Sequence, residues 1–339
     1  MRRRSFLVSL GLAALISACK KDAPSAGSGE AGASGKASPL RIAVIPKGTT
    51  HEFWKAVHAG AIKASREVDV EIVWKGPLKE DDLKAQIDVV QSFVAQGVSG
   101  IVLAPLSDTA LRSPVKAAVS AGIPVVVFDS DLQGEEHSSF VATDNVQAGK
   151  LAAEHMAKAL GGKGNVVVLR YQVGSASTAN RERGFLEAIK GSPGIKVLSD
   201  NQYGGATTES AFATSESLLA AQKASAGNVN GVFAPNESTT FGMLLALRKA
   251  DLAGKVRFVG FDASDKLLQA MEVGHIDALV VQDPFKIGHL AVKTMASRLR
   301  GQPVDKRIDT GARLVTKTNL FEPEIRELVK PDLKKWLGG

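Results

Sequence analysis

The sequence predicts an α/β fold made of two similar lobes, each built around a parallel sheet. From Leu40 onward, short runs rich in β-branched residues alternate with segments in which apolar residues recur at helical spacing. Such alternation is typical of parallel sheets joined by right-handed crossovers. The chain has 339 residues, of which 44% are hydrophobic and 23% charged, and this is enough for two domains with sizeable cores.

The first strand, loop and helix set the pattern for the rest of the chain. The run 41–45 is apolar and rich in β-branched residues, which predicts a buried strand. Residues 46–50 interrupt it with Pro and Gly, and Phe53, Val57 and Ala61 then recur at helical spacing. In an open parallel sheet, ligands collect at the carboxyl ends of the strands, where such loops emerge.

The same pattern continues in order along the chain. Gly97 and Gly122 end helices before the next strand begins. The first set has strands at 40–45, 70–74, 99–103, 124–128 and 138–142, with helices at 51–67, 80–96 and 108–121. The second set has strands near 165–169, 195–199, 230–234, 256–260 and 276–281, with helices near 145–160, 178–190, 208–221, 237–250 and 264–272. A helix at 285–300, an extended segment at 306–316 and a C-terminal helix at 324–336 follow. Ten strands are many for one sheet, which favours two lobes.

The N-terminus predicts export and lipid attachment. Residues 1–19 have a basic start, an apolar stretch from Phe6 to Ile16 and small residues before Cys19, as in a secretory signal, and are too short for a membrane span. The sequence Ile-Ser-Ala-Cys at 16–19 resembles the bacterial lipobox, which implies a diacylated Cys19. An ordinary signal peptide with an incidental cysteine is the alternative. Because Cys19 is the only cysteine, structural disulfides are excluded.

Two further features of this region bear on export and charge. Arg-Arg-Ser-Phe-Leu at 3–7 resembles a twin-arginine motif, so this route and the Sec route both stay open. Residues 20–39 are rich in Gly, Ser and Ala and predict a flexible tether. Removal of the signal lowers the number of Lys and Arg from 42 to 39 against 35 acidic residues. The remaining chain has no basic stripe, which argues against a nucleic-acid partner.

Polar side chains follow five of the predicted strands at the point where each strand ends. They are Asp129, Asp144 with Asn145, Asn236 with Glu237, Asp262, and Gln282 with Asp283. A single such residue is more often a helix N-cap or a turn former. The whole set, with Arg181 at the start of a helix and His51, Phe53 and Trp54 in the first loop, is harder to explain in that way. Carboxylates, amides and a guanidinium each bind vicinal hydroxyls, and aromatic faces cover the C–H side of a sugar ring. The set therefore predicts a polyol site.

These residues also carry a family resemblance. From Leu40 to about Asn319 the chain resembles the periplasmic sugar-binding proteins of ABC importers, in particular the ribose-type group. The matching stretches are THEFW at 50–54, VVVFDS at 125–130, ATDNVQAGKLAA at 142–153, NRERGF at 180–185, VFAPNE at 232–237, VGFDAS at 259–264 and VVQDPFKIG at 280–288.

The resemblance implies two doubly wound lobes joined by a hinge with three crossings, near Asp144, Gln282 and Arg313. The N-terminal lobe would comprise residues 40–143 plus 283–312, and the C-terminal lobe 144–282 plus 313–339. The sugar contacts of the family fall on His51, Phe53, Trp54, Asp129, Asn145, Arg181, Asn236, Asp262 and Gln282. Trp54 is favoured for ring stacking, whereas Phe53 fits the core equally well.

Two positions depart from the ribose-type pattern. Many ribose-type relatives have an arginine after the first aspartate, where this chain has Ser130, and the second-lobe aromatic residue is replaced by Ala206 or displaced to Tyr203. Ile-Pro-Lys at 45–47 and Asp-Ser-Asp at 129–131 are also similar to receptors for the branched polyol autoinducer-2, which adds Lys47 as a possible ligand contact.

Catalytic and metal-binding functions find little support in the sequence. No GxSxG, HExxH, CxxC or Walker A pattern occurs, and Gly-Gly-Lys-Gly at 161–164 precedes a strand instead of following one. His51 and His58 have no third ligand nearby in the sequence, so neither a metal nor a cofactor is expected.

The sequence thus predicts a lipid-anchored, monomeric, extracytoplasmic protein that binds a monosaccharide or small polyol and delivers it to an ABC permease. Three alternatives share some of these features. A LacI-type repressor needs an N-terminal helix-turn-helix, where this chain has a signal and a tether. An α/β enzyme needs a nucleophile–base arrangement, and the sequence shows no motif for one. A binding subunit of a chemoreceptor or sensor kinase would have the same sequence features and stays open.

Overall fold

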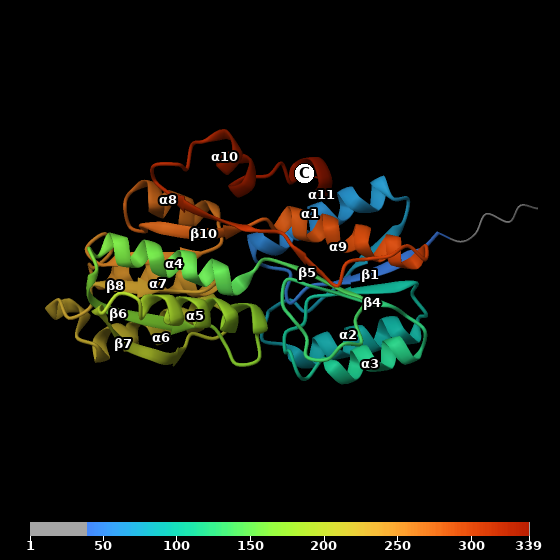
Figure 1. The fold of residues 1–339 in the computed structure, drawn as a ribbon, viewed down its shortest axis with the longest axis horizontal. Coiled ribbons are helices and arrows are strands. Elements are labelled where there is room, and N and C mark those ends of the chain that lie inside the picture. Colours follow the sequence, from blue (N-terminus) through green and yellow to red (C-terminus); the bar gives the residue numbers. More distant parts are fainter. Residues whose placement is uncertain (1–38, 339) are drawn as a thin grey trace, which may run out of the picture. The chain divides into compact units, whose positions relative to one another are not determined.

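The computed structural model describes residues 39–338, and its strands form two six-stranded sheets (Figure 1). The first sheet has the order β11-β5-β4-β3-β1-β2, with β1 at Arg41–Ile45, β2 at Glu71–Trp74, β3 at Gly100–Leu103, β4 at Val125–Phe128, β5 at Ser139–Ala142 and β11 at Arg307–Asp309. The second has the order β12-β10-β9-β8-β6-β7, with β6 at Lys163–Arg170, β7 at Gly194–Tyr203, β8 at Gly231–Phe233, β9 at Arg257–Phe261, β10 at Ala278–Gln282 and β12 at Ala312–Thr316.

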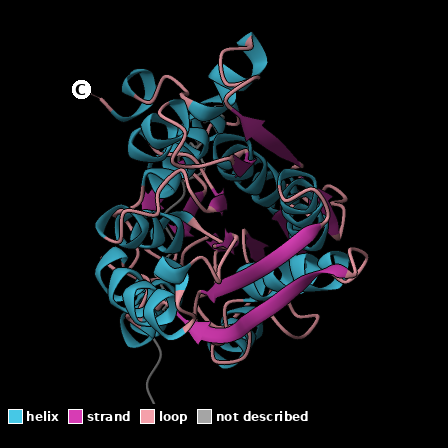
Figure 2. Ribbon diagram, turned by 90° about the vertical axis from the view of Figure 1, so that its left-hand side faces the viewer, coloured by secondary structure: helices cyan, strands magenta, loops and turns pink. Residues whose placement is uncertain are grey.

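Helices cover both faces of each sheet, so each lobe is doubly wound. Lobe 1 combines the first sheet with α1 (Glu52–Glu67), α2 (Leu83–Ala95), α3 (Arg112–Ser120) and α9 (Pro284–Leu299). Lobe 2 combines the second sheet with α4 (Asn145–Ala159), α5 (Ala176–Ile189), α6 (Thr208–Ala221), η1 (Ala224–Ala226), α7 (Glu237–Lys249) and α8 (Asp265–Glu272). Figure 2, seen from the side of lobe 2, shows helices on either side of its strands.

Within residues 39–338, no helix has the length and apolar character needed to cross a bilayer.

The alternation of strand residues explains why two core layers form in each lobe. In β1, Ile42 and Val44 pack toward α1 and α9, whereas Ala43 and Ile45 pack toward α2 and α3. All four side chains are essentially inaccessible to solvent. Buried on both faces, such strands read as continuous apolar runs, which is the pattern that predicted them. The predicted fold class, two mainly parallel α/β lobes, is confirmed.

The expected extended segment at 306–316 is two strands in different sheets. β11 pairs parallel with β5, and β12 pairs antiparallel with β10. Gly311, with φ of 78°, lies between them and lets the chain turn from one sheet to the other. The chain also passes between the sheets after β5 and after β10, so three connections join the lobes.

The prediction of one C-terminal helix at 324–336 is wrong. The structure has α10 at Pro323–Val329 and α11 at Lys334–Leu337. Pro331 is the physical reason, because proline disfavours helical geometry in the residue before it and cannot donate a helical hydrogen bond. Lys330 accordingly has φ of −138° and ψ of 64°. α10 packs against the core of lobe 2, whereas Trp336 in α11 lies 6.2 Å from the ring of Phe285 in α9.

Close helix packing fixes the position of α5 relative to α4. A Cβ atom on Gly149 would lie 2.0 Å from the backbone oxygen of Arg181, and one on Gly184 would lie 2.1 Å from that of Val146. Only glycine permits this approach of the two backbones. The contact brings Arg181 to the edge of lobe 2 that faces lobe 1.

Candidate functional site

The carboxyl ends of the two sheets face each other across a buried polar cavity. Its volume is about 30 Å³. In lobe 1, its lining comes from the loops after β1, β2 and β4 and from the start of α1. In lobe 2, it comes from the ends of β6, β8, β9 and β10 and from α5 and α7. The lining residues are Lys47, His51, Phe53, Trp54, Glu80, Asp129, Tyr171, Ser177, Thr178, Arg181, Asn236, Glu237, Asp262 and Gln282.

The structure brings almost all of the sequence-predicted residues to this cavity. Those that line it are Lys47, His51, Phe53, Trp54, Asp129, Arg181, Asn236, Asp262 and Gln282. Asn145 lies one layer behind, where its Oδ1 accepts a hydrogen bond from Nε of Arg181 at 2.7 Å. The predicted lipidation site, Cys19, lies outside the described residues.

Asp129 and Asp262 occupy equivalent places in the two lobes. Each follows the last residue of a central strand, and each has a left-handed backbone, with φ of 61° for Asp129 and 63° for Asp262. Aspartate tolerates this conformation better than most residues, yet it remains strained, and such strain is concentrated at functional sites. Both backbone amides stay bonded to the neighbouring strand, to Val141 and Val280, at 3.0 Å. The turn aims both carboxylates into the cavity.

Arg181 joins several groups of lobe 2 at the cavity. Its side chain is 2% exposed, its Nη1 donates to the carbonyl of Pro235 at 2.9 Å, and the same atom lies 3.9 Å from Oδ2 of Asp262. Its guanidinium also lies over the ring of Phe261, 4.6 Å from the centroid. Burial raises the pKa of Asp262, and Arg181 opposes that rise.

Lys47 in lobe 1 makes bonds to both lobes. Its Nζ lies 3.4 Å from Oδ2 of Asp129 and donates to the hydroxyls of Ser175 and Ser177 in lobe 2, each at 3.1 Å. Lys47 is 3% exposed, so its ammonium group has lost its water, and these contacts compensate for that loss. Burial raises the pKa of Asp129, whereas Lys47 lowers it.

Glu80 is the hub of a second buried network. Its carboxylate lies 2.8 Å from Nδ1 of His51 and accepts from the indole N–H of Trp54 at 2.6 Å. The hydroxyl of Tyr171, from lobe 2, donates to the other oxygen at 2.5 Å. Trp54, favoured for stacking on a ligand, is 2% exposed and edge-on to Phe53. Its ring is therefore anchored in the core of lobe 1 with one edge at the cavity.

Some strand-end residues cap the helix that directly follows them, and Asp262 does not. Asn236 accepts from the backbone amide of Thr239 at 3.2 Å and so caps α7, and Asp144 and Asp283 cap α4 and α9 in the same way. Asp262 does not cap α8, the helix that follows it; its carboxylate accepts from the side-chain amide of Gln282 at 2.7 Å and from the backbone amide of Glu237, the first residue of α7, at 3.1 Å. Among the described residues, the Oε1 atom of Gln282 is buried without a hydrogen-bond donor. Such an acceptor suits a donor from a ligand.

Sequence reasoning did not assign five residues of the lining as ligand contacts: Glu80, Tyr171, Ser177, Thr178 and Glu237. Tyr171 directly follows β6, and Glu237 follows Asn236, so the strand-end rule contains a signal for both. Glu80 lies in the polar segment KEDD, where nothing marks it for burial. Ser177 is the second residue of α5; it is 2% exposed and contacts Lys47 and Ser130 of lobe 1.

The pKa values of His51 and Glu80 follow from the burial of both groups and from the short distance between them. Burial lowers the pKa of His51, but the charge and hydrogen bond of Glu80 outweigh it and raise that pKa from 6.5 to about 9. Burial likewise raises the pKa of Glu80, and His51 overcomes this to bring it to about 2. Burial raises the pKa of Glu237 to about 7, despite the nearby charge of His51. The pair is thus ionised at neutral pH.

Stability should therefore fall at alkaline pH. Because the folded-state pKa of His51 is about 9 and its unfolded value 6.5, its contribution is complete below pH 6.5 and disappears as pH rises to 9. We expect the free energy of unfolding to drop by about 3 kcal/mol over this range. Urea unfolding at both pH values measures it. His51→Gln should flatten the dependence, and an unchanged slope in that variant would exclude His51 as its source.

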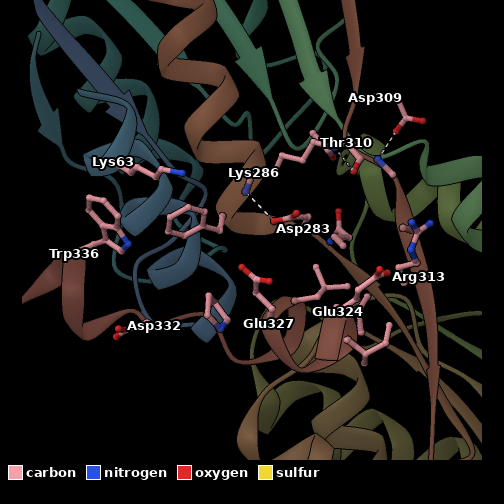
Figure 3. Close-up of a pocket in the computed structure, with 18 of the residues that line it drawn as sticks. Lys63, Asp283, Lys286, Asp309, Thr310, Arg313, Glu324, Glu327, Asp332 and Trp336 are labelled. Carbon is pink, nitrogen blue, oxygen red and sulfur yellow. Dashed lines mark hydrogen bonds between the residues drawn. The ribbon is translucent and has the colours of Figure 1, made fainter. Parts of the chain in front are cut away.

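A larger cavity of about 870 Å³ lies between the hinge and the C-terminal helices (Figure 3). The labelled side chains around it include the acids Asp283, Glu324 and Glu327 and the cations Lys63 and Lys286. Of the predicted residues it contains only Gln282, and the contributing side chains are mostly solvent-accessible. We place the candidate site in the smaller cavity, because its polar groups are buried and converge from both lobes.

Within residues 39–338, no cluster of His, Cys, Asp and Glu has the arrangement of a metal site.

Comparisons with known proteins agree with this architecture. Residues 42–303 match the family model described as periplasmic binding protein domain. The chain is 32% identical over 261 residues to the galactofuranose-binding protein YtfQ of Escherichia coli, which covers 74% of this chain and 80% of that protein.

Two solved structures share the fold. One is a carbohydrate transporter solute-binding protein from Agrobacterium radiobacter in complex with D-arabinose, with 33% identity, a TM-score of 0.82, and coverage of 86% of this chain and 99% of that one. The other is an ABC transporter solute-binding protein from Agrobacterium vitis with bound D-fucose, with 34% identity, a TM-score of 0.81, and coverage of 86% and 100%. The chain therefore belongs to the periplasmic binding protein family.

Proposed function

We propose that this protein captures a monosaccharide or small polyol between its two lobes and delivers it to an ABC permease. The observation that carries the proposal is the convergence of buried carboxylates, amides and Arg181 from both lobes on one cavity. These groups bind vicinal hydroxyls in pairs. The relatives add support, because D-arabinose and D-fucose occupy solute-binding proteins of the same fold.

The proposed mechanism requires the lobes to separate. A cavity of about 30 Å³ is far smaller than the roughly 300–1,000 Å³ of typical ligand pockets. The three connections between the lobes would serve as the hinge. Ligand would bind to one lobe, contact the other on closure, and favour the closed form by its higher affinity for it. The permease would then recognise the two lobe surfaces in that arrangement.

We propose specific roles for the lining residues. Asp129 and Asp262 accept hydrogen bonds from ligand hydroxyls, and Arg181 donates to ligand oxygens, since their side chains meet at the cavity. Asn145 acts through Arg181, which it holds at 2.7 Å. Asn236, Gln282, His51 and Lys47 complete the polar contacts, and the edges of Phe53 and Trp54 supply the apolar wall.

The decisive experiment is a thermal-shift screen of pentoses, hexoses, polyols and autoinducer-2. A ligand present at a hundred times its dissociation constant should add about 2.7 kcal/mol to the free energy of unfolding. We expect at least one sugar or polyol to raise the melting temperature in a concentration-dependent way. A set of such compounds that leaves it unchanged at millimolar concentration would overturn the proposal.

We also propose that the protein is a lipoprotein attached to the cell envelope through Cys19. The support is sequence alone: a lipobox-like Ile-Ser-Ala precedes the chain's single cysteine. Cys19→Ala should abolish incorporation of a fatty-acid probe in metabolic labelling, because acylation requires the thiol. Labelling that persists in Cys19→Ala would disprove the anchor, and Ser17→Ala, which keeps a small residue there, serves as the matched control.

A further inference from the structure

Three helices that begin at the interface between the lobes are not capped by their own N-cap residues. Within residues 39–338, the N-cap side chains of α1, α5 and α8 make no capping hydrogen bond, nor do those of α3, α10 and α11, whereas those of α2, α4, α6, α7 and α9 do. The first amide groups of a helix have no intrahelical acceptor and need one from elsewhere.

For α5, the acceptor comes from lobe 1. The amide of Ser177, the second residue of α5, donates to the hydroxyl of Ser130 at 3.1 Å. The hydroxyl of the N-cap residue Ser175 instead accepts from Nζ of Lys47, also in lobe 1, at 3.1 Å. Ser130 and Ser175 are completely buried. Lys47 of lobe 1 therefore occupies the hydroxyl of Ser175, and Ser130 of lobe 1 accepts from the helix amide in its place.

For α1 and α8, the exchange is reciprocal. The carboxylate of Glu237 in lobe 2 accepts from the amides of Glu52 and Phe53, the first two residues of α1, at 3.4 and 3.2 Å. The carboxylate of Glu52 in turn accepts from the amide of Asp265, the first residue of α8 in lobe 2, at 3.3 Å. A negative charge at a helix N-terminus is additionally favoured by the helix dipole.

We propose that Ser130, Glu52 and Glu237 are positioning residues that cap helices of the opposite lobe and thereby favour the closed arrangement before ligand arrives. Because every one of these bonds joins the two lobes, opening would break them all and return the helix amides to water. Caps inside one lobe persist in both arrangements and do not favour either. The inference rests on the proposed hinge closure.

The test measures the distance between lobes in the full chain without added ligand. Cys19→Ser removes the single native thiol, and Lys116→Cys in α3 with Glu187→Cys in α5 provides one exposed spin-label position in each lobe. Double electron–electron resonance then reports the populations with short and long distances. We expect Ser130→Ala and Glu52→Ala each to lower the short-to-long ratio about fivefold, which corresponds to about 1 kcal/mol per lost cap.

Matched controls come from caps that act within one lobe. Thr207→Ala removes the cap of α6, and Asp82→Ala removes that of α2. Both should lower the melting temperature and leave the distance distribution unchanged. Hydrogen exchange should become faster at the start of α5 in Ser130→Ala but not in Thr207→Ala. Glu52 is exposed, so its variant should fold even if the buried Ser130→Ala does not.

Two results would overturn the inference. One is an unmutated protein that shows only the long distance, and the other is an unchanged ratio in Glu52→Ala or in a folded Ser130→Ala. The sugar screen remains a separate test. If the cap variants change the short-to-long ratio but no sugar binds, the proposed ligand is wrong and the capping inference stands. If a sugar binds but the variants leave the ratio unchanged, the capping inference is wrong and the proposed ligand stands.

Discussion

Replacement of Arg181 by alanine should lower sugar affinity by about ten- to a hundredfold. The guanidinium is 2% exposed and faces the cavity beside Asp262, so its removal leaves ligand oxygens without a donor and a buried carboxylate without its neighbouring cation. A hydrogen bond to a charged group contributes roughly 1.5–3 kcal/mol, and about 1.4 kcal/mol is a factor of ten in affinity. Calorimetric titration with the sugar found by screening measures the change.

Arg181 also has structural partners, and the experiment must separate the two roles. Its bonds to Asn145 and Pro235 lie within lobe 2 and do not need a ligand. Arg181→Lys keeps the charge but loses the planar fork, so affinity should still fall about tenfold, with a smaller loss of stability. Asp262→Asn is the companion variant, because it keeps the shape of the side chain. If affinity holds within about threefold while the ligand-free protein melts earlier, these residues are structural.

Glu80→Gln should lower the free energy of unfolding by about 3–5 kcal/mol. Loss of the carboxylate charge leaves the buried His51 cation without its counter-ion, and breaking a buried pair in this way is strongly destabilising. The amide also has only one acceptor atom for the donors on Trp54 and Tyr171. Denaturant unfolding near neutral pH measures the loss.

The neighbouring acid provides the control for Glu80. Asp81 is exposed, so Asp81→Asn should change stability by less than about 0.5 kcal/mol. The double variant Glu80→Gln, His51→Gln should be less destabilised than the sum of the single variants, because no cation is then left unpaired. Full additivity would show that the two side chains do not act as a pair.

Local sequence pattern is enough to predict most of this fold. Strand residues buried on both faces give continuous apolar runs, and helices give a 3.6-residue period, so both are visible in a short window. The prediction of one helix over 324–336 misses the break between α10 and α11, although Pro331 itself signals it. The two strands at 307–309 and 312–316 could not be separated in the same way, because their assignment to different sheets depends on which distant strands they meet.

For the site, the sequence determined which side chains stand at the carboxyl ends of the strands, because that position follows from the order of strand and turn. Asp129, Asp262 and Gln282 were predicted in this way, and all three line one cavity. The sequence does not determine what each end group contacts. Asn236 and Asp262 look alike in the sequence, yet Asn236 caps the helix that follows it, whereas Asp262 accepts from Gln282 in the neighbouring strand and from the first amide of α7.

Only the tertiary structure decided which groups from distant parts of the chain meet. Glu80 and Tyr171 are 91 residues apart, and nothing in either local sequence indicates that they share a hydrogen bond. The same holds for Ser130 and Ser177, whose bond forms where two lobes approach. The physical reason is that periodicity and turn chemistry act over a few residues, whereas these contacts depend on how two separately folded sheets pack together.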